Sequence, residues 1–362
     1  MATPNAERWH QKPTALMGGV AIYLGLSIPV FLAADFRSLL PLLLLNSSTA
    51  NLPSICATLW ICATFLFILG LVDDFVSIKP QTKLVGQILV AALISFLGFR
   101  LHWFTSLTLD TMVTIVWVVG LTNAFNLIDN MDGLCTGIGL IAAVCLVFLF
   151  RGTPLAESML ASYILAGALA AFLIFNFKPA SIFMGDSGSL VIGFTLALLT
   201  LHHSEASPNT ISLYAVPLLV LMVPIFDTIL VSIIRILSGR KASVGGKDHT
   251  SHRLVLMGLN ERNAVLFLYG IGILSGLSAF FITRSDNLTS PMVIAPIAIS
   301  LLLMGIYLAQ IRVYPEKEFS VLRDKPYTPI LVDITYKKQL LLVILDFGMI
   351  SFAYYLSYRL RF

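Results

Sequence analysis

Long apolar runs alternate with short polar segments along almost the entire chain. A helix needs about 20 predominantly apolar residues to span a bilayer, and eleven runs reach or approach that length. A backbone in lipid must satisfy its own hydrogen bonds, so runs this apolar are expected to be helices. The pattern therefore predicts an all-α, polytopic membrane helix bundle with about 11 transmembrane helices, at 15–35, 54–72, 84–99, 110–124, 134–150, 158–176, 188–202, 211–236, 263–283, 291–311 and 340–358.

The composition agrees with this prediction. Of the 362 residues, 57% are hydrophobic and only 12% are charged, whereas a soluble domain has about 25% charged residues. The net charge of +4 is too small to indicate a nucleic-acid partner. The four cysteines lie in or beside apolar runs without C-x-x-C spacing, so we interpret them as packing residues, not as a disulfide framework or zinc ligands.

Basic residues are distributed unevenly between the connecting loops. If the N-terminal segment lies in the cytoplasm, the loops on its side are 73–83, 125–133, 177–187, 237–262 and 312–339. By our count that side carries sixteen Lys and Arg residues and the opposite side carries six. This excess fits the rule that cytoplasmic loops are rich in Lys and Arg. It also places every polar motif described below on the cytoplasmic side.

The first polar motif is NAFNLIDNMDGL at 123–134. Asn123, Asn126, Asp129 and Asp132 recur at three-residue steps, so on a helical continuation they would share one side. Oxygen ligands on one face suit a hard cation such as Mg²⁺. The alternative is a polar contact between helices of the bundle, which one Asn would fit better than four polar residues do.

The second motif, GLVDDFVSIKPQTKLVGQ, places two adjacent acids, Asp73 and Asp74, at the end of an apolar run. Adjacent carboxylates raise each other's proton affinity unless a cation lies close. A divalent metal, or the following Lys79 and Lys83, would supply that cation. Ordinary helix-end charges are the alternative, although acids at the edge of a membrane segment are functional candidates by default.

Two further motifs complete the polar set. In NFKPASIFMGDSGSL, Asp186 belongs to a turn that opens the predicted helix 188–202, where it either helps to form an anion site or simply caps the helix. In GRKASVGGKDHTSHRL, His249, His252 and Arg253 suit phosphate groups better than zinc, because no cysteine or third histidine is near; a solvated loop is the alternative. Together the four motifs predict a site for a metal and phosphates at one membrane face.

The order and spacing of these motifs resemble those of the polyprenyl-phosphate N-acetylhexosamine-1-phosphate transferase family, of glycosyltransferase family 4 type, which includes the phospho-N-acetylmuramoyl-pentapeptide transferases. The resemblance covers 8–311 and is specific as a combination, although no single motif is. The matching segments are HQKPTALMGG at 10–19, LGLVDDF at 69–75, NAFNLIDNMDGL at 123–134, NFKPASIFMGDSGSL at 176–190, VPIFDT at 223–228 and DHTSHRL at 248–254.

The resemblance implies an enzyme of the bacterial cytoplasmic membrane with its active site facing the cytoplasm. It would transfer a HexNAc-1-phosphate, GlcNAc-1-phosphate above all, from a UDP-sugar to undecaprenyl or another polyprenyl phosphate and release UMP, as the first membrane step of cell-envelope glycan synthesis. Mg²⁺, with Mn²⁺ as the alternative, is the implied cofactor, and a homodimer is the implied assembly. For individual residues it implies catalytic roles for Asp73, Asp74, Asp129, His249 and His252, metal binding by Asp186 and Asp129, and nucleotide or substrate binding by Asn126, Asp132, Asn176, Phe183 and Lys83.

Two of these implied roles are more specific. One aspartate of the 73–74 pair is expected to deprotonate or orient the lipid phosphate, and Phe183 to stack on uracil.

The sequence departs from the family pattern in three places. The usual first membrane helix is not found before His10, so either the start is truncated or mis-assigned or that helix is absent. Ala15-Leu16 replaces the usual Pro-Arg, and the histidine motif reads His-Thr-Ser-His. The last departure favours a UDP-HexNAc substrate over the alternative of a pentapeptide transferase. A secondary transporter, the alternative from another class, would hold its acids near the bilayer midplane in inverted repeats, which we do not find. We expect 8–311 to form the transferase domain and 312–362 to add a cytoplasmic segment and a further transmembrane helix.

Overall fold

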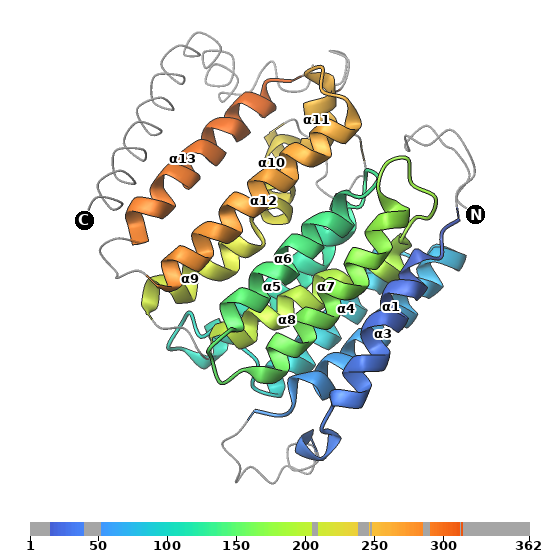
Figure 1. Cartoon of the computed structure of the whole chain (residues 1–362), viewed down its shortest axis with the longest axis vertical. Helices are drawn as coiled ribbons and strands as arrows, with labels where there is room; N and C mark the ends of the chain where they lie inside the picture. Colours follow the sequence, from blue (N-terminus) through green and yellow to red (C-terminus); the bar gives the residue numbers. More distant parts are fainter. Residues whose placement is uncertain are drawn as a thin grey trace. The chain divides into compact units, whose positions relative to one another are not determined.

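The computed structural model describes residues 15–39, 52–204, 209–237, 246, 248–284, 290–311 and 313. Every regular element within these residues is a helix (Figure 1), and the only other pairing described is an isolated bridge between Ala15 and Ile182. The predicted all-α fold is therefore confirmed. The predicted helix at 340–358 and the segment before Ala15 lie outside the described residues, so the predicted domain boundary at 312 stays a prediction.

The chain divides into two compact units. The first contains residues 1–224 and 269–283, and the second contains 225–268 and 284–362. Each unit is described by itself. The first holds the polar motifs at 69–75, 123–134 and 176–190, and the second holds the histidine motif.

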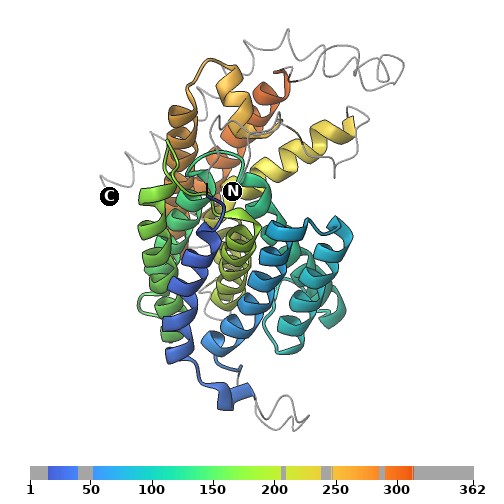
Figure 2. The same cartoon turned by 90° about the vertical axis from the view of Figure 1, so that its right-hand side faces the viewer.

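The first unit is a bundle around one central helix, α8 (Gly185–Ser204). Every residue from 187 to 201 is buried, because α8 packs against α1, α3, α5 and α6, and the two views in Figures 1 and 2 show it among these helices. The other elements of this unit are α1 (Gly18–Ala33), the short 3₁₀ helix η1 (Phe36–Leu39), α3 (Ile55–Val76), α4 (Pro80–Phe96), α5 (Leu107–Ile128), α6 (Leu134–Phe150), α7 (Ala156–Asn176) and α9 (Thr210–Val220).

The second unit contains most of α10 (Met222–Leu237), all of α11 (Thr250–Leu256) and α13 (Ser290–Ala309), and the start of α12 (Glu261–Thr283). Arg253 of α11 joins two of these elements. Its guanidinium donates to the backbone carbonyls of Leu308 (3.0 Å) and Ile311 (2.8 Å) at the end of α13. These bonds satisfy carbonyls that have no partner within a helix, so the histidine-bearing helix is held against α13.

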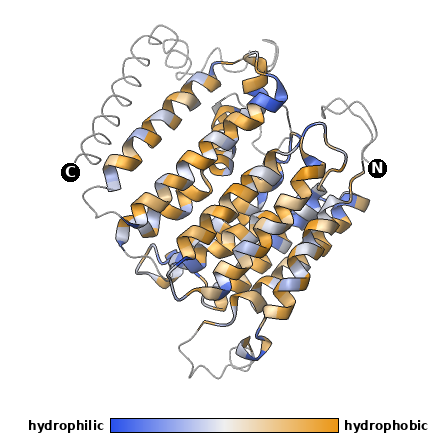
Figure 3. Cartoon of the chain, viewed as in Figure 1, coloured by the Kyte–Doolittle hydropathy of each residue, from blue (hydrophilic) through white to orange (hydrophobic). Residues whose placement is uncertain are grey.

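The helices have the lengths and polarity expected for a membrane protein. Among the described residues, α3, α5, α7, α12 and α13 are long and apolar enough to cross a bilayer, and α1, α4 and α6 are shorter apolar helices. Figure 3 shows apolar residues covering the helices, with polar residues mainly at helix ends and in loops. The predicted polytopic bundle is confirmed.

One predicted helix is wrong in detail. The apolar run at 211–236 is not a single helix, because α9 ends at Val220 and α10 begins at Met222. Pro224 explains the break, since a proline ring clashes with the carbonyl four residues earlier, which here belongs to Val220. In the first turn of α10 the missing proline N–H is no loss, because those amides have no partner within the helix.

Candidate active site

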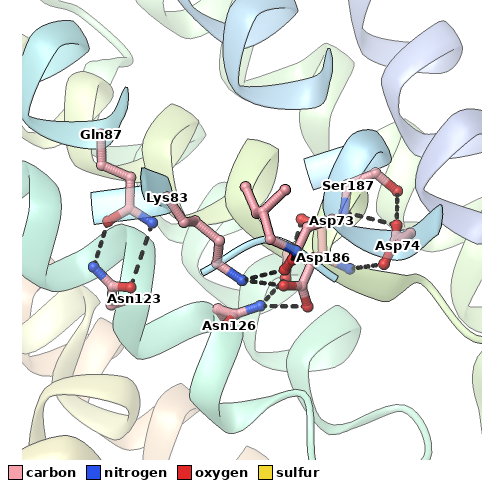
Figure 4. A network of polar contacts seen from close by, with 10 residues as sticks. Asp73, Asp74, Lys83, Gln87, Asn123, Asn126, Asp186 and Ser187 are labelled. Carbon is pink, nitrogen blue, oxygen red and sulfur yellow. Dashed lines mark hydrogen bonds and ion pairs between the residues drawn. The ribbon is translucent and has the colours of Figure 1, made fainter. Parts of the chain in front are cut away.

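Four helices of the first unit bring their polar residues together at one place. Asp73 and Asp74 come from the last turn of α3, Lys83 from the first turn of α4, Asn126 from the last turn of α5, and Asp186 from the first turn of α8. Figure 4 shows these side chains in a continuous network. The prediction that acidic and basic positions from separate motifs converge is therefore confirmed for these five residues.

Two carboxylates of the network share one ammonium group. The Nζ atom of Lys83 lies 2.8 Å from Oδ2 of Asp73 and also contacts Oδ2 of Asp186. The Lys83 and Asp73 side chains are 14% and 15% exposed, whereas that of Asp186 is 30% exposed. The cluster is thus partly shielded from solvent, which strengthens charge interactions, yet Asp186 remains accessible to a ligand.

The remaining carboxylate oxygens have fixed partners. Oδ1 of Asp73 accepts a hydrogen bond from the backbone N–H of Ile78 (2.8 Å), and Oδ1 of Asp186 accepts one from the amide of Asn126 (2.9 Å). The same Asn126 amide also donates to the hydroxyl of Ser189, one turn further along α8 (3.0 Å). Asn126 therefore orients Asp186 from α5, and its predicted binding role is matched by a position inside the network.

Asp74 points away from Lys83 and towards the start of α8 (Figure 4). Its Oδ1 accepts the backbone N–H of Asp186 (2.8 Å), and its Oδ2 accepts the N–H and hydroxyl of Ser187 (3.1 and 2.7 Å). The helix begins at Gly185, three residues before the predicted start, so Asp186 lies inside the first turn. The alternative in which Asp186 caps the helix is therefore wrong; Asp74 caps it from α3.

The predicted row of Asn123, Asn126, Asp129 and Asp132 along one helix side is wrong beyond Asn126. Helix α5 ends at Ile128, and a turn follows that leads to Gly133, whose positive φ of 77° suits glycine. Asn123 itself forms a reciprocal amide pair with the buried Gln87 of α4, at 2.5 and 3.3 Å. For Asn123, the polar helix–helix contact was the better interpretation.

Asp129 and Asp132 belong to the turn after α5. Asp129 is the C-cap residue, half-buried, and its predicted catalytic and metal-binding roles stay predictions. Asp132 accepts the backbone N–H of Ala180 (3.1 Å), which ties this turn to the loop before α8. Burial lowers the pKa of the neighbouring Lys178, and the Asp132 carboxylate opposes that shift.

Asn176 and Phe183 hold the loop that precedes α8. Asn176 is 2% exposed; its oxygen accepts the hydroxyl of Thr136 (2.7 Å) and its amide donates to the carbonyl of Ile182 (2.9 Å). The backbone of the half-buried Phe183 accepts from Gly18 (2.9 Å) and donates to Ala15 (2.8 Å). Both residues therefore shape the loop, and their roles in binding a nucleotide stay predictions.

The histidine motif lies in the second unit and is almost fully buried. His249 shares a hydrogen bond of 2.7 Å between its Nδ1 and Oδ2 of Asp227, whose other oxygen accepts the N–H of Thr250 (2.6 Å). Asp248 pairs with Arg235 through Nε (2.8 Å). Burial raises the pKa of the Asp248 carboxyl, but the Arg235 guanidinium outweighs that effect and the pKa is lowered.

The ring of His252 lies beside that of His249, with ring centroids 6.0 Å apart. The solvated-loop alternative is wrong for His249 and His252, because both rings are buried, while most of the motif before Asp248 lies outside the described residues.

Sequence reasoning missed several partners of these residues. Gln87, Ser187 and Asp227 each contact a predicted site residue, yet none was selected as a site residue. Asp227 had a usable signal, because it is an acid inside an apolar run. Ser187 lies inside the motif that carries Asp186, although its partner is 113 positions away, whereas Gln87 had no signal, since uncharged polar residues are common in helices.

Comparison with known proteins finds similarity over the part of the chain that carries the network. The family model described as glycosyl transferase family 4 matches residues 56–204, which include the whole network around Lys83. A probable undecaprenyl-phosphate N-acetylglucosaminyl 1-phosphate transferase of Bacillus subtilis is 32% identical over 287 residues, covering 76% of this chain and 75% of the relative.

Two further relatives carry related names. A decaprenyl-phosphate N-acetylglucosaminephosphotransferase of Mycobacterium leprae is 30% identical over 330 residues, covering 83% of this chain and 81% of its own. A phospho-N-acetylmuramoyl-pentapeptide-transferase of Levilactobacillus brevis is 30% identical over 304 residues, covering 76% and 86%.

Proposed function

The chain belongs to glycosyl transferase family 4, and on that basis we propose that it transfers GlcNAc-1-phosphate from UDP-GlcNAc to a polyprenyl phosphate in the membrane, releasing UMP. The names of the Bacillus and Mycobacterium relatives support this donor and this class of acceptor. The observation that carries the proposal is the convergence of Asp73, Lys83, Asn126 and Asp186 from four helices.

This convergence suits phosphoryl transfer between two anions. Such reactions need positioning and charge neutralisation more than covalent participation by the protein. Lys83 can neutralise a phosphate oxygen, and Asp73 can orient the acceptor phosphate or take its proton. A strong base is not needed, because the second pKa of a phosphomonoester is about 6 and that proton is largely lost near neutral pH.

The residues present fit a magnesium ion. Mg²⁺ in phosphate-handling enzymes is bound by one or two carboxylates and completed by substrate phosphates and water. Asp73 and Asp186 already direct carboxylate oxygens at one point, which the ammonium of Lys83 occupies. Within the described residues, no group of three or more acidic, His or Cys side chains could form a metal site from the protein alone. When bound, Mg²⁺ would neutralise the diphosphate of the donor. Asp186 and Asp73 would hold it, with Asp129 as a further candidate ligand.

We place the network at the cytoplasmic face of the membrane. The excess of Lys and Arg in the loops that carry the motifs supports this side. A UDP-sugar would then reach the site from the cytoplasm, while the polyprenyl phosphate would approach from the surrounding lipid.

An assay of the purified protein in detergent tests the proposal. With undecaprenyl phosphate and Mg²⁺, UDP-GlcNAc should give UMP, and Asp186→Asn or chelation with EDTA should abolish the reaction. Glu157→Gln is a matched control, because Glu157 contacts Ser54 and Cys56 outside the network and the change again replaces a carboxylate by an amide. UMP formed equally well without the lipid acceptor, or by the Asp186 variant, would refute the proposal.

The donor panel also tests the alternative function. UDP-MurNAc-pentapeptide is included because the relative from Levilactobacillus brevis bears the name of a transferase for that group. A clear preference for it over UDP-GlcNAc would establish the alternative.

A further inference from the structure

The two adjacent aspartates at the end of α3 face different partners. Asp73 contacts the ammonium of Lys83 and the N–H of Ile78, whereas both carboxylate oxygens of Asp74 are taken by the first turn of α8. Neighbouring residues on a helix point about 100° apart. Asp73 therefore faces Lys83, while Asp74 faces the start of α8. Adjacent positions in the sequence therefore do not imply that Asp73 and Asp74 have the same function.

The contacts of Asp74 are those of a helix cap supplied by another helix. The first N–H groups of a helix have no partner within it, and a carboxylate at this end is favoured by the helix dipole. Asp74 satisfies the N–H groups of Asp186 and Ser187 and also binds the Ser187 hydroxyl. One of the two backbone N–H groups that Asp74 accepts therefore belongs to Asp186, the proposed metal ligand.

Space around this cap is limited on both helices. A Cβ atom on Gly185, which has a φ of 71°, would lie 2.7 Å from both Asp74 carboxylate oxygens. A Cβ on Gly70, one turn before Asp74 on α3, would lie 2.7 Å from the Asp186 carbonyl oxygen. The backbones of α3 and α8 thus meet in direct contact, and three of the roughly four acceptor sites of the Asp74 carboxylate are used to hold the first turn of α8.

We propose that Asp74 is a positioning residue for the proposed transfer: it sets the place of the Asp186 carboxylate by capping α8, while Asp73 alone of the pair faces the cation and substrate. This inference rests on the proposed function, because it assigns Asp186 to the metal. It keeps for Asp73 alone a catalytic role that the family resemblance implied for both residues.

The test compares Asp74→Asn, Ser187→Ala and the double variant in two measurements. The first is Mn²⁺ affinity by electron paramagnetic resonance without substrates, and the second is the pH profile of kcat. Asp74→Asn should weaken Mn²⁺ binding and lower kcat by roughly tenfold to a hundredfold, the scale of a misplacement of about 1 Å, with the shape of the pH profile unchanged. Ser187→Ala should act in the same direction by a few-fold, and the double variant should be no worse than Asp74→Asn.

Two results would overturn the proposal. Asp74→Asn with wild-type Mn²⁺ affinity but a pH profile that loses a limb would show that Asp74 itself exchanges a proton. Independent, additive effects of the Asp74 and Ser187 changes would show that they do not act through one cap. Thermal unfolding of each variant identifies global misfolding, and Ser187→Ala provides the test if Asp74→Asn does not fold.

The metal measurement separates this proposal from the proposed function. If the wild-type protein releases no UMP with any donor, the proposed function fails. Weakened Mn²⁺ binding by the two variants would still support the positioning role of Asp74.

Discussion

Replacing Gly70 by Ala should damage activity far more than stability. A Cβ atom at this position would lie 2.6 Å from the Cα atom of Ser187 and 2.7 Å from the Asp186 carbonyl oxygen, about 0.8 Å inside the 3.4 Å at which ordinary contact begins. Both neighbours are backbone atoms, so no side chain can rotate away. The start of α8 has to move by that distance, and Asp186 moves with it.

The expected magnitudes follow from this displacement. Overpacking costs about 1–3 kcal/mol, but alanine gains about 1 kcal/mol over glycine within a helix, so the net loss of stability should be about 0–2 kcal/mol. A misplacement of about 1 Å at a reacting centre can cost roughly a hundredfold in rate. We therefore expect kcat for UMP release to fall by one to two orders of magnitude.

Gly120→Ala is the matched control for this experiment. Gly120 lies inside α5, which also contributes to the site, and a Cβ atom there meets no neighbour within 4 Å. Its kcat and Mn²⁺ affinity should equal those of the wild type. The reasoning is refuted if Gly70→Ala behaves like Gly120→Ala in both measurements, because α3 and α8 would then not be in direct contact.

Three further predictions concern charged groups. Lys83→Met should tighten Mn²⁺ binding several-fold, because no ammonium then competes for the carboxylates of Asp73 and Asp186. The same change should lower kcat. Unchanged Mn²⁺ affinity would show that Lys83 and the metal do not compete for these two carboxylates. Asp227→Asn should lower kcat without altering Mn²⁺ affinity, since it weakens the contacts that orient His249 and the start of α11, and a wild-type rate would exclude a role for that orientation. Asp248→Asn should cost about 3 kcal/mol at pH 7, because it leaves the Arg235 charge buried without its partner. The pKa of Asp248 is lowered in the folded protein, so the pair stabilises above the unfolded value of about 3.9, and the difference in thermal stability from the wild type should shrink as the pH falls through the lowered pKa.

The sequence predicted the helices well because apolar runs of this length have few alternatives in a membrane. Each predicted run between 15 and 311 coincides with a helix or with the pair α9 and α10. The break between α9 and α10 follows from Pro224 and was visible locally, whereas the start of α8 depends on a non-local contact. Helix α8 starts earlier than its apolar run because the cap comes from Asp74, a residue 112 positions away from Asp186. Local periodicity carries no information about such a partner.

Four of the predicted site residues meet in the structure, whereas the separate contacts of Asp73 and Asp74 were not predicted. Asp73, Lys83, Asn126 and Asp186 were all selected, and they meet as expected. The amide pair of Asn123 could not be assigned, because an Asn that binds a ligand and an Asn that binds another helix look the same in a sequence. Only the position of Gln87, 36 residues earlier, decides between them.

The shared ammonium has a consequence for the order in which substrates arrive. Two carboxylates balanced by one lysine leave the cluster with an excess of one negative charge, so a nucleotide sugar entering alone meets repulsion. A bound divalent ion would offset that negative charge and make the cluster more favourable for a diphosphate. Initial-rate kinetics should therefore show that the donor binds productively only when the metal is present, with Lys83 then available to the phosphate of the lipid acceptor.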